Sequence, residues 1–187
     1  LDSSGQIVYV WSAYKDGNSK YGIYLSIANP SSGSKSAPYE VKYDGSNDYV
    51  LPCVTTTNGN IIVAYQLKNS TSAYSSKVYY NILEYSGTTI SSNNEYEHGT
   101  ETRNGNSTTD IVTLSNSSFV IVWTDYAQHP RYNHHCHRGG CSNHHSGWYY
   151  YQDIEFIVKD LGGSTLNNQR TYENNDTNSH EHKLCLP

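Results

Sequence analysis

Methionine is absent from this 187-residue sequence, and cysteine, proline and phenylalanine are scarce. No apolar stretch approaches the roughly 20 residues that a membrane-spanning helix needs, so we expect no membrane span. No Lys/Arg-rich run occurs and the net charge is −5, which argues against a nucleic-acid partner. Since the sequence begins at Leu1, we expect it to be a processed or partial segment of a protein.

Tyrosine is abundant, with 19 copies, and it recurs beside runs of Val, Ile and Thr. Disordered chains lack both features, whereas strands are enriched in them. No segment keeps a helical period of 3.6 residues. The composition therefore predicts an all-β fold with essentially no helix, in which the large aromatic side chains pack against sheet faces.

A repeat organises the chain. Apolar runs that end in an aromatic residue recur as QIVYVW (6–11), NIIVAY (60–65) and FVIVW (119–123), and the final aromatics are 54 and 58 residues apart. Each run is followed by a second predicted strand, a Gly-containing turn, a third strand and a short apolar strand. The short strands are YVLPCVTT (49–56), TDIVTL (109–114) and HKLCLP (182–187).

Four short antiparallel strands in about 55 residues is the size of a β-propeller blade. We therefore expect residues 1–187 to form a single repeat-built β domain. Its units are approximately 6–56, 60–114 and 119–187, with an insert at 126–147 in the third. Three blades cannot close a ring, since propellers have about four to eight. The domain is expected to stay open, to be completed by neighbouring subunits, or to fold as one compact sandwich.

Residues 11–33, WSAYKDGNSKYGIYLSIANPSSG, resemble the tandem repeat of large secreted or surface proteins. In that repeat a V-V-W strand is followed by a D-G loop, a Y-G-I-Y strand and a glycine turn. The match is good over 6–33, partial over 60–87 and weaker over 119–163. The resemblance implies a blade-like β repeat in an extracellular protein, and it implies no catalytic residues.

Other features also indicate an extracellular or cell-surface location. Four N-x-[ST] sequons predict glycosylation at Asn69, Asn106, Asn116 and Asn175. The cysteines are few and clustered, and lysine is scarce relative to uncharged polar residues.

The insert at 126–147 contains the stretch NHHCHRGGCSNHH (133–145). Cys136 and Cys141 enclose a Gly-Gly pair, so an easily formed disulfide would close this insert in an oxidising compartment. The competing interpretation is a Zn or Cu site, although the cysteine spacing is not one of the sharp zinc spacings. Its candidate ligands are the histidines His134, His135, His137, His144 and His145.

Cys53 and Cys185 fall at near-equivalent repeat positions, VLPCV against HKLCL. They are either two buried thiols or a disulfide, within one chain or between neighbouring copies.

The sequence contains no H-E-x-x-H, G-x-S-x-G, P-loop or Rossmann motif, so no enzymatic activity and no obligatory cofactor are expected. The leading hypothesis is an extracellular structural or adhesive scaffold that is glycosylated and self-assembles into a surface fibre or array, as a homo-oligomer or filament. One alternative is a propeller module that binds a glycan or protein. Another is a secreted metal-binding domain that uses the His/Cys insert.

Overall fold

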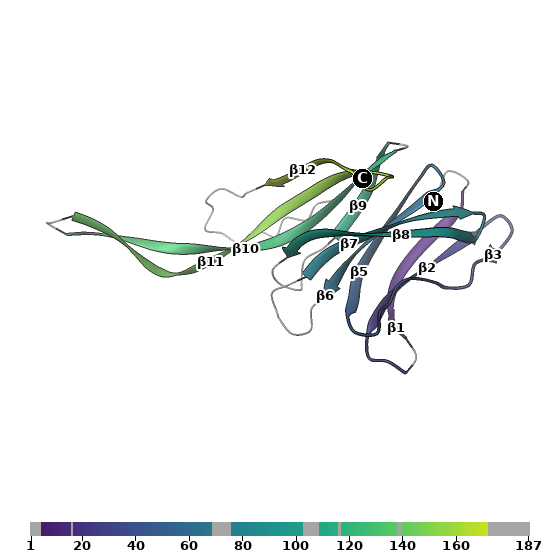
Figure 1. Ribbon diagram of the computed structural model, residues 1–187, viewed down its shortest axis with the longest axis horizontal. Coiled ribbons are helices and arrows are strands. Elements are labelled where there is room, and N and C mark those ends of the chain that lie inside the picture. The colour runs from purple at the N-terminus through teal and green to yellow at the C-terminus, as the bar shows by residue number, and fades with distance from the viewer. Residues whose placement is uncertain are drawn as a thin grey trace.

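A computed structural model of the chain describes residues 5–15, 17–68, 76–102, 109–115, 117–137 and 140–171 (Figure 1). Within residues 125–153 only the backbone is described. The described residues form twelve β-strands and no helix, which confirms the all-β expectation. Accordingly, this part of the chain holds no helix long and apolar enough to cross a membrane.

The strands form three four-stranded antiparallel sheets, and none of the sheets is closed. In the first sheet, β1 pairs with β2, and both β3 and β4 pair with the other edge of β2. The other two sheets are simple meanders, β5-β6-β7-β8 and β9-β10-β11-β12. The bounds are β1 Ile7–Tyr14, β2 Tyr21–Asn29, β3 Ser34–Lys35, β4 Tyr39–Lys42, β5 Asp48–Thr57, β6 Asn60–Lys68, β7 Ser76–Ser86, β8 Thr89–Thr102, β9 Thr109–Ser115, β10 Ser118–His137, β11 Gly140–Asp160 and β12 Thr165–Thr171.

The sheets are offset by one strand from the repeat units as counted along the sequence. The short apolar strands β5 and β9 pair with β6 and β10, so each opens the sheet that follows it. The turn between β5 and β6 explains this pairing. Asn58 and Gly59 have φ values of +44° and +76°, as in the two-residue turns that join antiparallel neighbours.

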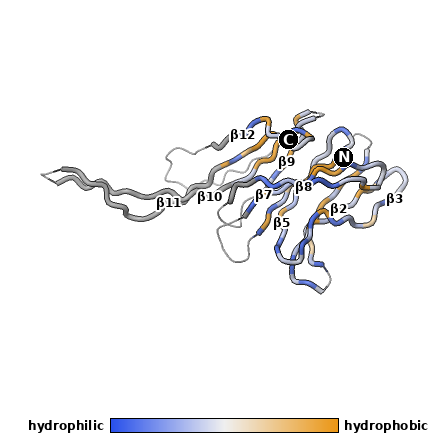
Figure 2. The backbone as a smooth tube through the Cα atoms, in the orientation of Figure 1, coloured by the Kyte–Doolittle hydropathy of each residue, from blue (hydrophilic) through white to orange (hydrophobic). Residues whose placement is uncertain are grey.

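Two hydrophobic clusters hold the three sheets face to face, and hydrophobic residues accordingly concentrate in the strands (Figure 2). The cluster between the first and second sheets contains the buried residues Ile23, Leu25, Ile27, Val41, Tyr49, Ile61, Val63, Tyr65 and Leu83. The cluster between the second and third sheets contains Ile62, Ala64, Val78, Tyr80, Ile82, Ile111, Phe119, Ile121, Trp123 and Ile157. The second sheet is therefore buried on both faces, and each outer sheet on one.

Polar contacts fix how the sheets lie on each other. Tyr65 donates a 2.6 Å hydrogen bond to Asn81, and Asn81 donates one of 2.6 Å to Asn93. Asn93 in turn donates to the carbonyl oxygen of Val41 in the first sheet, at 3.1 Å. A chain of satisfied polar groups that is at least partly buried helps to specify one arrangement of the two sheets.

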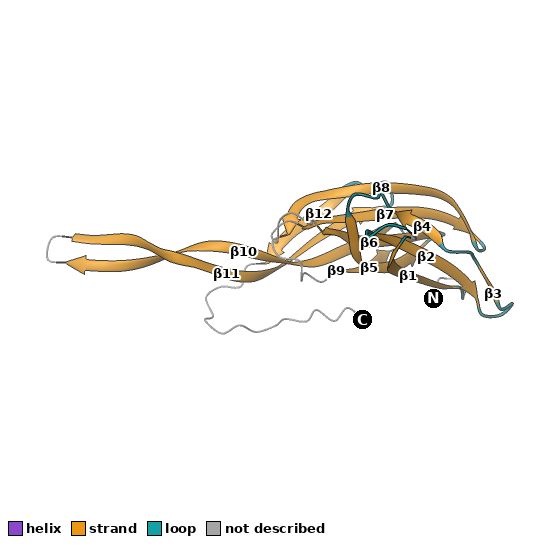
Figure 3. Cartoon of the chain, turned by 90° about the horizontal axis from the view of Figure 1, so that it is seen from below, coloured by secondary structure: helices purple, strands orange, loops and turns teal. Residues whose placement is uncertain are grey.

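The predicted insert at 126–147 is not a loop on the third unit but a continuation of its two central strands. β10 and β11 are 20 and 21 residues long, and they pair from Ser118–Asp160 out to His137–Gly140, with one register shift at Arg131/Tyr132. This hairpin arm projects well beyond the sheets (Figures 1 and 3). Every register pair adds backbone pairing to the arm, so the inserted residues extend the ladder instead of leaving it.

Candidate functional site

The outer face of the first sheet carries an exposed group of large side chains. It consists of Ile7, Tyr9 and Trp11 on β1 with Tyr24 on β2, and we call it the first end face. Ile7 and Tyr9 are 42% and 40% exposed, and Trp11 and Tyr24 are half-buried. None of the four belongs to either core cluster.

The same repeat positions are buried in the other two sheets. When the runs are aligned on the aromatic residue that ends each of them, Ile7 and Tyr9 correspond to Ile61 and Val63. Both are 0% exposed, in the core cluster between the first and second sheets. In the third sheet the corresponding residues are Phe119 and Ile121, again 0% exposed, and they face the second sheet. The first end face therefore has the side chains of a sheet–sheet interface but no sheet against it among the described residues.

The aromatic rings of the first end face form a continuous row. Tyr9 stacks on Trp11 with ring centroids 5.7 Å apart and planes at 24°, and Trp11 stacks on Tyr24 at 6.2 Å and 27°. Beside Tyr24 in the register lies Glu40, which pairs with Lys15 at 2.8 Å. The row is thus held in place by its own packing and bordered by a charged pair.

The outer face of the third sheet is apolar as well. Phe119, Ile121 and Trp123 point toward the second sheet, so the alternate residues Val120 and Val122 lie on the opposite face. Their apolar register partners there are Val112, Val158 and Phe156, all half-buried, while Val122 also lies opposite the exposed Asp110. The five apolar residues form the second end face. Val120 and Val122 themselves are 9% and 8% exposed, and no member belongs to either core cluster.

β1 lies at an open edge. β6 and β10, its equivalents in the repeat, each pair with a strand on both sides, whereas β1 pairs with β2 alone among the described strands. A strand at the edge of a sheet presents unpaired N–H and C=O groups that can accept another strand. Within the described part of the chain, β1 therefore has no counterpart of β5 and β9 beside it.

The register of the hairpin arm organises its cysteines and histidines. Cys136 lies directly opposite Cys141, and their neighbours pair as His134–Asn143 and His135–Ser142. Alternate positions of a strand share a face, so His134 and His145 occupy the same face of the arm as the two cysteines. His135, His137 and His144 share the other face.

Cys53 is packed against the core cluster between the second and third sheets, where its thiol donates a 3.6 Å hydrogen bond to the carbonyl oxygen of Ala64. Burial raises the pKa of this thiol to about 12, and nearby Asp110 contributes, so the thiolate that a nucleophile or metal ligand requires is suppressed. Cys185 and the four predicted glycosylation sites Asn69, Asn106, Asn116 and Asn175 lie outside the described residues, so these remain predictions.

The carboxylate of Asp44 stabilises the turn that precedes β5. The carboxylate of Asp44 accepts hydrogen bonds from Ser46, Asn47 and the hydroxyl of Tyr49. Although partial burial opposes this, these bonds hold the pKa of Asp44 well below its usual range. Among the described side chains no three His, Cys, Asp or Glu groups lie together as a metal site would need, and the arm histidines are not in that set.

No family model matches the sequence, and no curated protein or solved structure matches it either. The functional argument therefore rests on the two end faces, the open edge of β1 and the hairpin arm. The signal for the end faces was present in the sequence, because the three aligned runs carry the same apolar pattern. Only the order of the sheets shows which repeat unit has no described sheet packed on its face.

Proposed function

We propose that the chain is a non-enzymatic, extracellular scaffold protein that self-assembles head to tail from blade-like β units. The observation that carries this proposal is the exposure of Ile7 and Tyr9 at positions whose repeat equivalents are fully buried between sheets. Repeat proteins that stop growing have terminal units with polar outer faces. Here both outer faces are largely apolar, which favours further stacking.

The two end faces are complementary by construction. Where two sheets meet, the earlier sheet contributes side chains at the repeat positions of Val8 and Val10. The later sheet contributes side chains at the repeat positions of Ile7 and Tyr9. Val120 and Val122 of the second end face occupy the repeat positions of Val8 and Val10. The second end face of one copy would therefore pack against the first end face of another copy. A contact between two different surfaces repeats from copy to copy and builds a filament or a ring.

Sedimentation velocity over a range of concentrations tests this function. The wild-type chain should form species larger than the monomer as concentration rises, and Tyr9→Lys should keep it monomeric by placing a charge in the buried contact. Tyr14→Lys is the matched control, because Tyr14 lies on the same strand and is 55% exposed, but on the opposite face. A wild-type chain that is monomeric at all concentrations would refute the proposal.

The hairpin arm has a separate role in this proposal, as a presented binding element closed by a Cys136–Cys141 disulfide. Directly opposed residues of antiparallel strands have Cα atoms about 4.5–5.5 Å apart, within the 4.4–6.8 Å that a disulfide spans. His135, His137 and His144, on the other face, would be the ligands for Zn²⁺ or Cu²⁺. Titration of the chain with each metal, against a variant with these three histidines replaced by Gln, tests that role.

A glycan-binding module is the second candidate, supported by the row of Tyr9, Trp11 and Tyr24. Aromatic rings stack on sugar faces, and this row is ordered and partly exposed. The two candidates compete for one surface. An oligosaccharide that binds the monomer and is released by assembly would favour the glycan role, whereas assembly without any sugar affinity favours the scaffold.

A further inference from the structure

We infer that Tyr14 and Tyr21 form a modification site, at which a one-electron oxidant joins the two tyrosine rings by a covalent carbon–carbon bond. The bond would form within one chain, between the last residue of β1 and the first residue of β2. Hydrogen peroxide, used by a peroxidase, is the oxidant that this reaction needs. The inference does not depend on assembly of the chain, so the two proposals can fail independently.

The register of the β1–β2 hairpin brings the two rings into contact. Tyr14 lies directly opposite Tyr21 in the last pair of the ladder, and opposed residues of antiparallel strands interact on one face of the sheet. The ring centroids are 3.8 Å apart, and the ring planes are inclined at 32°. Hydrogen bonding with Tyr21 is the main cause that raises the pKa of Tyr14 above its usual 10.0, so the hydroxyl ends of the rings lie together. The ring carbons beside the hydroxyl-bearing carbons, where phenoxyl radicals couple, are therefore close as well.

Tyr21 is anchored, whereas Tyr14 is exposed enough for its ring to adjust. The backbone N–H of Tyr21 donates a 3.0 Å hydrogen bond to the carboxylate of Asp48, which also pairs with Lys20 at 3.2 Å. Tyr14 is 55% exposed and belongs to neither core cluster. Coupling requires the rings to turn until two ring carbons meet, and the exposed ring can do this without disturbing the core.

Distance and exposure together separate this pair from other stacked tyrosines among the described side chains. Tyr80 and Tyr96 stack with centroids 4.9 Å apart, but Tyr80 is fully buried. Tyr65 and Tyr79 stack at 6.0 Å, and Tyr65 is fully buried as well. An oxidant in solution reaches the ring of Tyr14 far more readily than these buried rings. A radical formed there has its coupling partner already in contact.

The reaction balances with one molecule of hydrogen peroxide. Each tyrosine hydroxyl loses one electron and one proton, which gives two phenoxyl radicals. Peroxide takes up both electrons and both protons and becomes two molecules of water. The radicals couple through the ring carbons beside the hydroxyl-bearing carbons, and each coupled carbon then passes its hydrogen to the phenoxyl oxygen. Both hydroxyls are restored, and the product has two hydrogen atoms fewer than the starting chain.

The bond would secure the strand at the open edge of the first sheet. β1 pairs with β2 alone among the described strands, so its backbone hydrogen bonds depend on one partner. The bond closes a ring over residues 14–21 at the turn end of the hairpin, where it opposes separation of the two strands. Amide exchange in β1 should therefore become slower after oxidation.

Oxidation of the dilute chain with hydrogen peroxide and a haem peroxidase, followed by denaturation and tryptic digestion, tests the inference. Trypsin cuts after Lys15, Lys20 and Lys35, so the bond would link the peptides 1–15 and 21–35. The linked pair should show dityrosine fluorescence, with a mass two hydrogen atoms below the sum of the two peptides. When unlabelled and heavy-isotope chains are oxidised together, each linked pair should be entirely light or entirely heavy.

Three variants assign the bond to its residues. Tyr14→Phe keeps the ring but has no hydroxyl to oxidise, so the linked pair should disappear, and Tyr21→Phe provides the same test if Tyr14→Phe folds poorly. Tyr9→Phe is the matched control and should leave the yield unchanged, because Tyr9 lies in the same peptide and strand as Tyr14 and is 40% exposed. The inference would be overturned by a wild type without the linked pair, by a pair that survives Tyr14→Phe or Tyr21→Phe, or by pairs that mix light and heavy peptides.

Discussion

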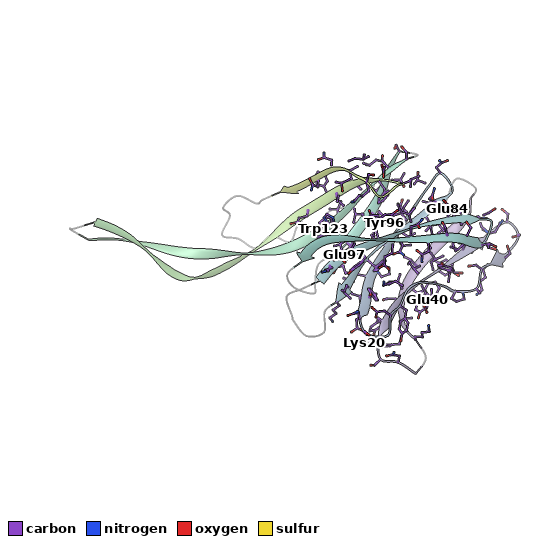
Figure 4. All side chains as sticks on the ribbon, in the orientation of Figure 1. Lys20, Glu40, Glu84, Tyr96, Glu97 and Trp123 are labelled. Carbon is purple, nitrogen blue, oxygen red and sulfur yellow. The ribbon has the colours of Figure 1, made fainter. Side chains whose placement is uncertain are left out.

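Trp11 and Trp123 occupy the same position of the repeat in different surroundings. Trp123 is 2% exposed and is packed between the second and third sheets, near the point where the hairpin arm begins (Figure 4). Trp11 contacts Tyr9 and Tyr24 on the first end face. The sequence predicted that both would pack on a sheet face, and it gave no sign that one would lie at the end of the stack.

This difference predicts unequal costs of truncation. Trp123→Ala should lower the free energy of unfolding by about 3–5 kcal/mol, the range for a fully buried aromatic. In dilute protein Trp11→Ala should cost only about 1 kcal/mol, the contribution of a partly exposed aromatic pair, while abolishing assembly. Urea denaturation of both variants at low concentration measures the two costs, and equal losses would contradict the end-face assignment.

His98 gives the fold a pH dependence. Its ring meets that of Trp123 edge to face at 5.0 Å, and burial, with a smaller contribution from Lys159, lowers the pKa of His98 below its usual 6.5. The unfolded chain therefore binds a proton at this site before the folded chain does, so stability should fall as the pH drops below about 6.5. No sequence pattern marked this residue, since its environment comes from two different sheets.

Denaturation at pH 7.5 and 5.5 should show this loss, and His98→Gln should make it smaller. For one group the slope is at most about 1.4 kcal/mol per pH unit, and partial exposure of His98 reduces it. If His98→Gln leaves the pH dependence of the wild type unchanged, the buried neutral histidine is not its source.

The strands themselves were largely predictable from the sequence, because β-branched and aromatic runs between turns carry a local signal. The repeat alone does not fix how the strands group into sheets, because it has no intrinsic starting point. Asn58-Gly59 held the information, since a two-residue turn forces β5 to pair with β6. The insert stood out in the sequence as an addition to the third unit, yet strand pairing depends on the backbone and continues through it to His137.

The hairpin arm should depend on its cysteines, and the three sheets should not. The ring from Cys136 to Cys141 is small, so a disulfide there would stabilise the arm by about 2 kcal/mol in the chain-entropy description. Cys136→Ser/Cys141→Ser should speed amide exchange in the arm and leave the unfolding midpoint of the sheets unchanged. Equal exchange in the wild type and the variant would indicate that no such disulfide forms.

At the scale of the whole molecule, the three described sheets form an open stack whose two outer faces are largely apolar. The buried equivalents of Ile7 and Tyr9 show what the repeat does with such a face when a neighbour is present. A translational stack with unlike ends has no internal reason to stop at three sheets. Edge strands and bare faces favour association, and here both occur at the same end, on β1.

Hydrogen exchange of the β1 segment, residues 6–14, tests the central claim most directly. It should be compared in concentrated and dilute samples of the wild-type chain and of Tyr9→Lys. If a neighbouring copy packs against the first end face, the β1 amides of the wild type become strongly protected on concentration, and Tyr9→Lys shows no change. Equal exchange of β1 in concentrated and dilute wild-type chain would contradict the account.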